Sequence, residues 1–305
     1  MGLRWHYRLH GFGLTSEFEL PELVRDEQGG DAADVVLRVG RVPERLDAAR
    51  EQGACYAAAP GEMLFWLPGV ARFHVAAGRE IVVDPQPGAA GETLRSLVLS
   101  SPLAALLLQR GLLPLHASAV ATPKGAAVFA GSAGLGKSTL AAAWHRQRGL
   151  VPLSDDISAL RVGENEPPAV LPGYPALRLW PDAHRALGVE ADGPTLRPGV
   201  AKKLVALAVS FPREPVPLAA VYILDQRELP PGAAAPGPFS GAEALAAILD
   251  VIYRPAFVRG MGLERRVFAQ AAALARTARI APWLRPPGRF DPAGRGPNVF
   301  ENPLQ

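Results

Sequence analysis

Cysteine is almost absent from this sequence. Cys55 is the one cysteine among 305 residues, so no disulfide can form within the chain. A secreted domain stapled by disulfides is therefore excluded, and the composition predicts a cytoplasmic protein in a reducing environment. No catalytic role is predicted for Cys55.

A long hydrophobic run is also missing. In the most apolar stretch, "LRSLVLSSPLAALLLQRGLLPL", about a dozen apolar residues precede Gln109 and Arg110, whereas a spanning helix needs about 20. The N-terminus "MGLRWHYRLHGFG" lacks the apolar core of a signal peptide. The sequence therefore predicts a soluble protein without a membrane partner, with one buried helix over residues 94–110.

A large excess of one charge is the third absence. The 32 basic and 29 acidic residues leave a net charge of +3, which does not favour nucleic acid as a partner. Arginine is nevertheless concentrated: between residues 251 and 290 there are eight arginines and one acid, Glu264. Two interpretations stay open, a solvated helical face or a site for an anionic partner or substrate.

What the chain does contain is enough apolar sequence for a core, at 49% hydrophobic residues. Residues 1–111 predict a β-rich N-terminal module that ends in the apolar helix. Residues 112–285 alternate strands and helices, which predicts an α/β domain. The Pro/Gly-rich stretch 229–241 predicts a loop or linker, and residues 286–305 a flexible tail.

One motif in residues 112–285 predicts a specific chemistry. "GSAGLGKST" follows the predicted strand "AAVFA" and opens the predicted helix 137–148. This is the arrangement of a phosphate-binding loop, in which backbone N–H groups and a lysine hold nucleotide phosphates and a serine hydroxyl binds Mg²⁺. The predicted cofactors are ATP and Mg²⁺. The predicted nucleotide-binding residues are Gly131, Ser132, Ala133, Gly134, Leu135, Gly136, Lys137, Ser138 and Thr139.

Two adjacent carboxylates end the next predicted strand, "LVPLSDDISAL". Asp155 and Asp156 lie 18 and 19 residues after Lys137, a separation at which strand, loop and helix return the chain to the phosphate loop. Such a pair is suited to divided roles, one carboxylate on Mg²⁺ and the other accepting a proton from the attacking hydroxyl. A simple turn without chemistry is the alternative for the pair. Asp225, at the end of "AAVYILD", is a weaker candidate for the metal.

The segment "LHASAV…GAAVFAGSAGLGKSTLAAAWHRQRGLVPLSDDISAL…LPGYPALRLWPD…AKKL" resembles the HPr kinase/phosphorylase family over roughly residues 112–225. It is most similar to the HPr-kinase-like proteins of lasso-peptide biosynthesis, and "LHGFGLTSEFELPEL" supports that likeness. The resemblance implies a nucleotide domain related to phosphoenolpyruvate carboxykinase, with a P-loop on a mixed sheet. It is compatible with a homo-oligomer.

The resemblance also implies roles for single residues. Asp155 would be the base that deprotonates a substrate serine, and Asp156 would bind Mg²⁺ with Ser138. His116 and Arg178 match family residues near the transferred phosphate, although His116 also suits a purely structural position. Lys202 or Lys203 would add a positive charge to the γ-phosphate, and either could instead be a solvated strand residue.

Two departures from the family pattern concern the direction of the reaction and its substrate. Thr139 stands where the family has an acidic residue, and Ala176 where its phosphorolysis loop has a glutamate. The first hypothesis is therefore a one-way kinase that phosphorylates a serine hydroxyl on a ribosomal precursor peptide. The alternatives are a kinase of a free amino acid or sugar, and an ATPase or nucleotide-sensing switch that binds a protein.

Overall fold

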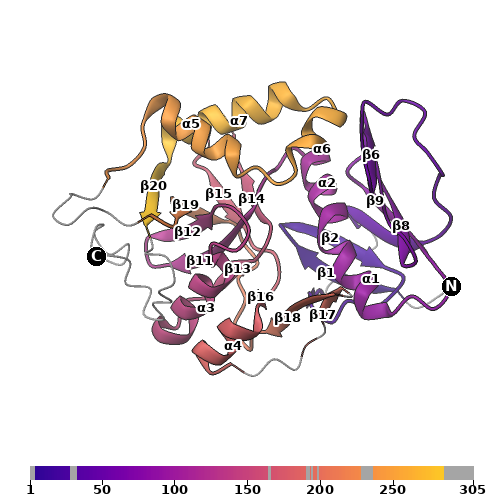
Figure 1. Cartoon of the computed structure of the whole chain (residues 1–305), viewed down its shortest axis with the longest axis horizontal. Coiled ribbons are helices and arrows are strands. Elements are labelled where there is room, and N and C mark those ends of the chain that lie inside the picture. Colours follow the sequence, from indigo (N-terminus) through magenta and orange to yellow (C-terminus); the bar gives the residue numbers. More distant parts are fainter. Residues whose placement is uncertain are drawn as a thin grey trace.

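The computed structural model describes residues 4–27, 33–163, 166–189, 193, 195–197, 199–227 and 236–284. Its mixed α/β architecture confirms the fold class at that level (Figure 1). The predicted tail over residues 286–305 lies outside the described residues, and so do residues 229–235 of the predicted linker. No helix in the described ranges is long and apolar enough to cross a membrane.

The N-terminal part is a nine-stranded sheet in the order β3-β1-β2-β4-β9-β8-β7-β6-β5. Its strands are β1 (Trp5–Leu9), β2 (Phe12–Ser16), β3 (Val24–Arg25), β4 (Val35–Val39), β5 (Glu51–Gly53), β6 (Tyr56–Ala59), β7 (Glu62–Leu67), β8 (Ala71–Ala76) and β9 (Glu80–Pro85). The segment "PGVARFHVAAGREIVV" lies in the predicted β-rich module and contains β8 and most of β9, which pair antiparallel as a hairpin. Residues 71, 73 and 75 of β8 are buried and their neighbours are half-buried, as the two-residue period of a strand requires.

The prediction of a single helix over residues 94–110 is wrong. Two helices occupy the segment, α1 (Gly91–Val98) and α2 (Ser101–Gln109). Ser100 leaves the helical region, with φ −127° and ψ −115°, and Pro102 stands in the first turn of α2, where its missing N–H costs nothing. The expected burial is confirmed, since every residue from Ser101 to Leu108 is buried.

The second sheet has eight strands, in the order β10-β14-β15-β19-β12-β11-β13 with β20 beside β19. The strands are β10 (Leu113–Leu115), β11 (Ala117–Thr122), β12 (Gly125–Ala130), β13 (Pro152–Ser154), β14 (Ser158–Arg161), β15 (Ala169–Leu171), β19 (Val216–Asp225) and β20 (Arg279–Leu284). The pairs β12–β19 and β19–β20 are parallel and the others antiparallel. The sheet is therefore mixed.

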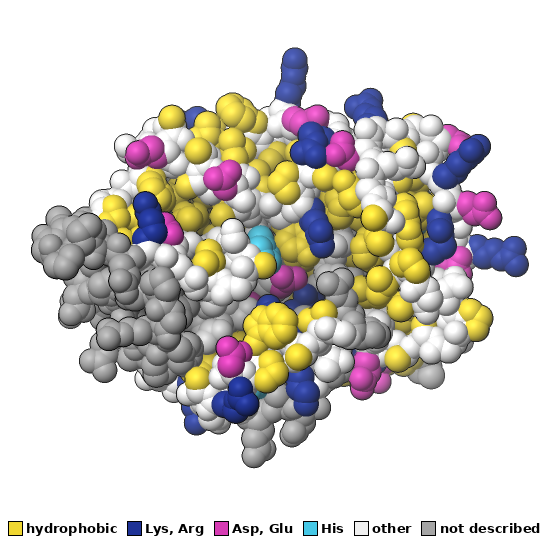
Figure 2. Space-filling model, in the orientation of Figure 1, with side chains coloured by type: hydrophobic (Ala, Val, Ile, Leu, Met, Phe, Trp, Pro, Cys, Tyr) yellow, Lys and Arg dark blue, Asp and Glu magenta, His cyan; other side chains and the backbone are white. Residues whose placement is uncertain are grey.

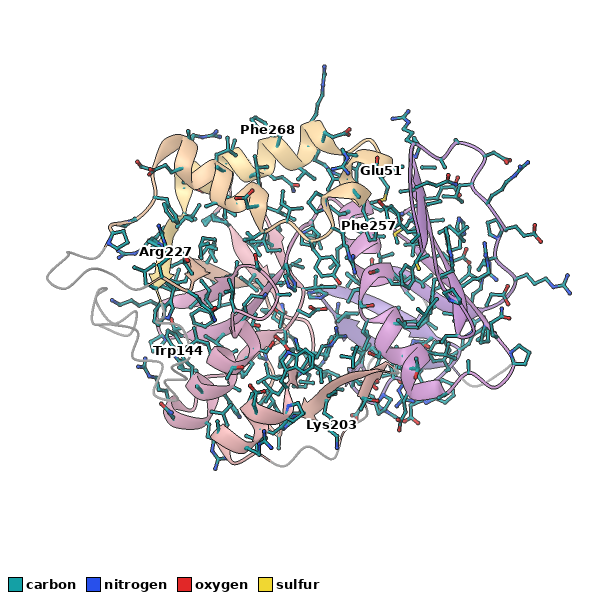
Figure 3. All side chains as sticks on the ribbon, viewed as in Figure 1. Glu51, Trp144, Lys203, Arg227, Phe257 and Phe268 are labelled. Carbon is teal, nitrogen blue, oxygen red and sulfur yellow. The ribbon has the colours of Figure 1, made fainter. Side chains whose placement is uncertain are left out.

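Helices cover both faces of this second sheet (Figure 1). Alternate residues of β12 divide between two cores: Val128 joins the large core with α5 (Gly241–Asp250) and α7 (Glu264–Thr277), and Phe129 joins a second core with α3 (Lys137–Arg148) and α4 (Pro181–Leu187). In that second core Phe129, Trp144 of α3 and Trp283 of β20 meet edge to face (Figure 3). The helix expected over residues 137–148 is confirmed as α3, whereas α6 (Pro255–Gly260) and β20 were not expected.

The large core also joins the two sheets. It contains Phe73 of the N-terminal sheet, Leu106 of α2 and Val128 of the second sheet. The predicted module boundary at residues 111/112 lies between α2 and β10, so α2 is enclosed by both parts. This explains why α2 is apolar all round rather than on one face.

The connections of the second sheet bring two short segments together. Although β10 and β11 are consecutive in the chain, they lie near opposite ends of the strand order, and so do β13 and β14. His116 is the whole link in the first case, and Asp155–Ile157 form the link in the second. Because both links cross the same seam, the histidine and the aspartate pair become neighbours.

A third sheet, of three strands, lies beside α4 in the order β16 (Ala176–Leu179), β18 (Val200–Ala206), β17 (Thr195–Arg197). It carries the predicted Arg178, Lys202 and Lys203. Strands β16 and β18 pair antiparallel, with Arg178 opposite Leu204 and Leu179 opposite Lys203.

Candidate functional site

A cavity of about 730 Å³ lies where the N-terminal sheet, the start of α2 and the second sheet meet. Figure 2 shows this face hollowed near its middle, where a histidine and charged side chains lie among hydrophobic ones. The cavity is lined by Ala54, Cys55, Tyr56, Phe65, Leu67, Ser96, Leu97, Ser100, Ser101, His116, Gly131, Ser132, Ala133, Asp156, Arg178, Val200, Asp250, Val251, Ile252, Tyr253, Arg254 and Phe257.

The predicted phosphate loop has the backbone that the glycines require. The chain leaves β12 at Ala130, turns through residues 131–136 and enters α3 at Lys137. Gly131 has φ +143° and Gly136, the residue before α3, has φ +84°. A Cβ on Gly131 would lie 3.1 Å from the carbonyl oxygen of Leu224, so a side chain would be strained and crowded there.

Lys137 folds back onto this loop. Its Nζ donates hydrogen bonds to the carbonyl oxygens of Gly131 (2.8 Å) and Ser132 (2.9 Å). Burial lowers the pKa of Lys137 to about 8, although Asp156 and Asp155 oppose the shift. The ammonium is thus held at the mouth of the loop, where it can exchange its carbonyl partners for phosphate oxygens.

Asp155 faces the protein interior. It is 5% exposed, its Oδ1 accepts a hydrogen bond from the Ser118 hydroxyl (2.5 Å), and its Oδ2 accepts one from the backbone N–H of Arg178 (2.6 Å). Asp155 is not among the residues that line the cavity. This geometry suits a carboxylate that fixes β16 in place, and it argues against the predicted role of Asp155 as the base.

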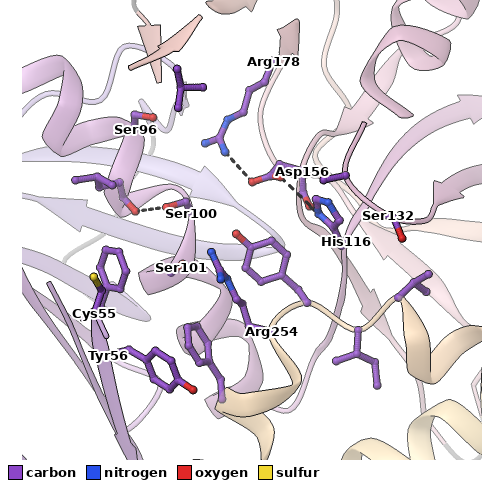
Figure 4. A pocket seen from close by; sticks show the side chains of 18 of the residues that line it. Cys55, Tyr56, Ser96, Ser100, Ser101, His116, Ser132, Asp156, Arg178 and Arg254 are labelled. Atoms are coloured by element: carbon purple, nitrogen blue, oxygen red, sulfur yellow. Dashed lines mark hydrogen bonds and ion pairs between the residues drawn. The ribbon is translucent and has the colours of Figure 1, made fainter. Parts of the chain in front are cut away.

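Asp156 faces the cavity instead. It has left-handed backbone, with φ +68°, so its side chain turns away from the course of Asp155. Its side chain is 22% exposed and lines the cavity. Its Oδ2 accepts a hydrogen bond from Arg178 at 2.8 Å, and its Oδ1 lies 3.5 Å from Nδ1 of His116 (Figure 4). A non-glycine residue in this conformation is uncommon and is often found at functional sites.

Arg178 is fixed from several sides. It is 4% exposed; its guanidinium also donates to the carbonyl oxygen of Leu99 and to the Tyr174 hydroxyl, both at 3.1 Å. The break between α1 and α2 explains the first bond, since an unbroken helix would occupy the Leu99 carbonyl. Burial alone would lower the pKa of Arg178, but Tyr174 and both aspartates outweigh burial and raise it, so the side chain stays charged.

His116 completes the group. Its Nδ1 also lies 3.1 Å from the backbone carbonyl oxygen of Asp156, and its ring meets that of Tyr253 edge to face at 5.8 Å. Burial, and next the charge of Lys137, lower the pKa of His116. The imidazole is therefore neutral at pH 7, so it donates through one nitrogen and accepts through the other.

The third sheet distinguishes the two lysines. Because side chains alternate along a strand, Lys202 shares the face of Leu204 and Arg178, while Lys203 shares the face of Leu179, which is buried in the second core. Lys202 lies over the ring of Trp180 at 5.8 Å, and its charge helps to lower the pKa of Lys137. Lys202 is therefore the lysine on the cavity side of this sheet.

The weaker candidates lie elsewhere. Asp225, at the end of β19, forms an ion pair with Arg227 (2.5 Å) and does not line the cavity. Five of the six arginines that the structure describes in the basic region are exposed and lie outside the cavity, as the first interpretation predicts: Arg259 pairs with Glu51, and Arg266 donates to the carbonyl oxygen of Leu108. Arg254 is different, because it lines the cavity.

Several residues of the site carry no motif that the sequence shows. Ser118 has a retrospective signal, since it lies two residues after His116, near the start of β11. Tyr174, which holds Arg178, has none. The wall formed by Tyr56, Phe65 and Phe257 comes from segments some 200 residues apart, and only the tertiary fold assembles it.

The oxygen ligands needed for Mg²⁺ are present. The Ser138 hydroxyl lies in the first turn of α3, directly after Lys137, and Asp156 offers the accessible carboxylate of the pair. No cluster of three or more His, Cys, Asp or Glu side chains occurs in the described ranges that would bind a metal unaided. This donor set fits Mg²⁺, which proteins often hold with one or two side chains plus nucleotide phosphates and water.

Comparisons with known proteins give a distant likeness. No protein-family model and no curated protein matches the chain. Among solved structures 83 chains match, including the Hpr(Ser) kinase/phosphatase from Coxiella burnetii, with 19% sequence identity and a TM-score of 0.25 over 50% of this chain and 93% of that chain. A TM-score of this size carries no functional conclusion, so function is inferred below from the geometry of the cavity.

Proposed function

We propose that the protein is an ATP- and Mg²⁺-dependent kinase that transfers the γ-phosphoryl group to a serine hydroxyl, with a ribosomal precursor peptide as acceptor. One observation carries the proposal: a glycine loop with a buried lysine opens onto the same cavity as an accessible carboxylate held by an arginine. A cationic phosphate site beside a proton acceptor is what phosphoryl transfer to a hydroxyl requires.

The phosphate side of the cavity supplies positive charge. Lys137 and the N–H groups at the start of α3 would hold the β- and γ-phosphates, and Arg178 and Lys202 would add charge around the transferred group. Ser138 would hold Mg²⁺ together with the nucleotide phosphates and water, and the bound Mg²⁺ would supply further charge.

The proton acceptor that we favour is Asp156, in place of Asp155. Its Oδ1 is the carboxylate oxygen not bonded to Arg178, and it lies on the cavity side next to the neutral His116. A serine hydroxyl that approaches the γ-phosphate from the cavity would give its proton to this oxygen as the new O–P bond forms, and ADP would leave from the opposite side.

A free amino acid or sugar is a second candidate acceptor. A cavity of about 730 Å³ is within the range of small-molecule sites, so the volume alone admits such a compound beside the nucleotide phosphates. An ATPase or nucleotide-sensing switch remains the third hypothesis, distinguished by the absence of a phosphorylated product.

The test is incubation of the purified protein with γ-labelled ATP, Mg²⁺ and either serine-containing peptides or free serine and sugars, followed by mass spectrometry. A gain of one phosphate on a peptide serine supports the proposal. Label on a free small molecule would replace the acceptor, and release of inorganic phosphate alone would support the ATPase.

A further inference from the structure

We infer that Arg254 and the aromatic side chains around it form the acceptor subsite, which binds an acidic peptide segment whose serine lies within about three residues of a carboxylate. The inference rests on the proposed function, since it names the chemistry of the acceptor for the same cavity. It depends on a different set of residues from those that hold phosphate.

The first observation is the backbone of Arg254. This residue has φ +54° and ψ +69°, the left-handed region, and it directly precedes Pro255, which further restricts it. Four non-glycine residues in the described ranges have positive φ, and two of them, Asp156 and Arg254, line this one cavity. Strain that recurs at one cavity indicates a side chain placed for function.

The second observation is that no carboxylate of the described residues pairs with Arg254. Its neighbour Arg259 in α6 pairs with Glu51 at 2.7 Å, whereas Arg254 contacts the ring of Tyr253. The guanidinium lies over the Tyr253 ring at 5.8 Å. Figure 4 shows the Arg254 side chain extending into the cavity near Ser101. An arginine held in this way keeps donors for an anion.

The contacts of Arg254 and His116 with the Tyr253 ring limit the distance between Arg254 and the reacting groups. Arg254 and His116 both lie 5.8 Å from the ring of Tyr253. The distance between the guanidinium and the imidazole is therefore at most about twice 5.8 Å. An extended peptide advances about 3.3–3.6 Å per residue, so about three residues separate an anion on Arg254 from a hydroxyl beside His116.

The third observation is the apolar character of the surrounding wall. Tyr56 of β6 meets Phe257 of α6 edge to face at 5.2 Å, and Phe65 and Leu67 of β7 extend the wall. Figure 3 shows Phe257 between the N-terminal sheet and the C-terminal helices, while Phe268 lies on the outer side of α7. Such a wall favours apolar residues flanking the serine. Asp250 also lines the cavity, so the test below includes a peptide with a cation in place of the carboxylate.

Cys55 provides a probe of this subsite, because it is the only cysteine and it lines the same wall. We would measure its alkylation by iodoacetamide in the full-length protein with three capped peptides: acetyl-Leu-Glu-Ser-Phe-amide and its Gln and Lys counterparts. The Glu peptide should slow alkylation at concentrations roughly 10- to 100-fold lower than the other two, as expected for a charge-assisted hydrogen bond. Equal protection by all three, better protection by the Lys peptide, or no protection would overturn the inference.

Arg254→Asn is the matching variant, since asparagine tolerates the left-handed region but carries no charge. It should abolish the advantage of the Glu peptide while the melting temperature is unchanged or higher, a pair of results that a purely structural role would not give. Arg265→Asn, on the exposed face of α7, is the control and should behave as the native protein. A Glu preference that survives in Arg254→Asn would overturn the inference.

Binding of a fluorescent ATP analogue separates this inference from the proposed function. The native protein and Arg254→Asn should bind it equally. If neither binds it, the kinase proposal fails, while the Cys55 measurements still decide whether Arg254 recognises a carboxylate.

Discussion

The two walls of the cavity are built in different ways. The phosphate wall comes from one short stretch, residues 131–138, together with side chains fixed by buried hydrogen bonds to Asp155 and Asp156. The acceptor wall comes from β6, β7 and the segment 250–257, and its members are mainly aromatic and aliphatic. Phosphate chemistry requires fixed charge, whereas the choice of acceptor depends on shape and apolar contact, so we expect the two walls to respond differently to substitution.

The largest effect should come from Lys137 on the phosphate wall. Lys137→Ala should reduce phosphoryl transfer to below detection, because nothing else in the loop replaces its charge on the β- and γ-phosphates. Lys124→Ala, in the exposed turn between β11 and β12, is the control and should retain full transfer. Transfer is measured with γ-labelled ATP, and full activity of Lys137→Ala would remove the phosphate-loop assignment.

The same lysine predicts a pH dependence of nucleotide binding. With a pKa of about 8 in the free protein, Lys137 loses its charge as pH rises through 8. The affinity for ATP should therefore weaken above that pH and be steady below it.

The next effect separates the adjacent aspartates. Asp156→Asn should lower transfer by roughly 10²–10⁴ with ATP binding largely retained, as for loss of a general base. Asp155→Asn should instead lower the free energy of unfolding by about 1–3 kcal/mol, because an amide cannot accept from both Ser118 and the Arg178 N–H. Urea unfolding and single-turnover transfer of both variants are the measurements. A stable Asp155→Asn protein that has lost transfer, beside an active Asp156→Asn protein, would restore the assignment expected from the sequence.

That pair also shows how far the sequence could predict the site. The phosphate loop is local: its glycines, Lys137 and Ser138 are fixed by spacing along the chain, and the structure places them as expected between β12 and α3. The roles of Asp155 and Asp156 depend on a left-handed turn at one residue, and neighbours in sequence can face opposite sides of a chain. Spacing alone cannot show which one reaches the cavity.

The acceptor wall and parts of the fold could not be predicted from the sequence, for a different reason. Tyr56 and Phe257 read as ordinary core residues until the fold brings β6 and α6 together. The break at Ser100 interrupts an apolar period that continues across it, and its use becomes visible only when Leu99 accepts a bond from Arg178. Contacts between distant segments leave no local pattern.

A smaller effect tests how the N-terminal sheet is attached to the second sheet. His10 is buried in this junction; its Nδ1 lies 3.0 Å from the carbonyl oxygen of Leu171, and burial lowers its pKa to about 4. Below pH 6.5 the unfolded chain binds a proton that the folded protein excludes, so stability should fall as pH falls from 6.5 towards 4. The loss from pH 7.5 to 5 should be about 2 kcal/mol.

Urea unfolding at both pH values measures this loss. His10→Gln should show less of it, since glutamine can donate to Leu171 without titrating, whereas His74→Gln, at a part-buried hydrogen bond with Glu62, is the control that keeps it. An unchanged pH dependence in His10→Gln would show that His10 is not the group responsible.

The smallest effect concerns the edge of the phosphate wall, where a charged side chain and an aromatic side chain lie in contact. Trp180 is 44% exposed and carries Lys202 on its ring, so charge and aromatic surface occur there together. Lys202→Ala should weaken ATP binding by a few fold, which corresponds to the ~0.5–1 kcal/mol typical of an exposed charge. Lys203→Ala, on the opposite face of the same strand, is the matched control and should leave ATP binding unchanged. Binding of a fluorescent ATP analogue measures both, and a larger loss in Lys203→Ala would mean that β18 presents its other face to the nucleotide.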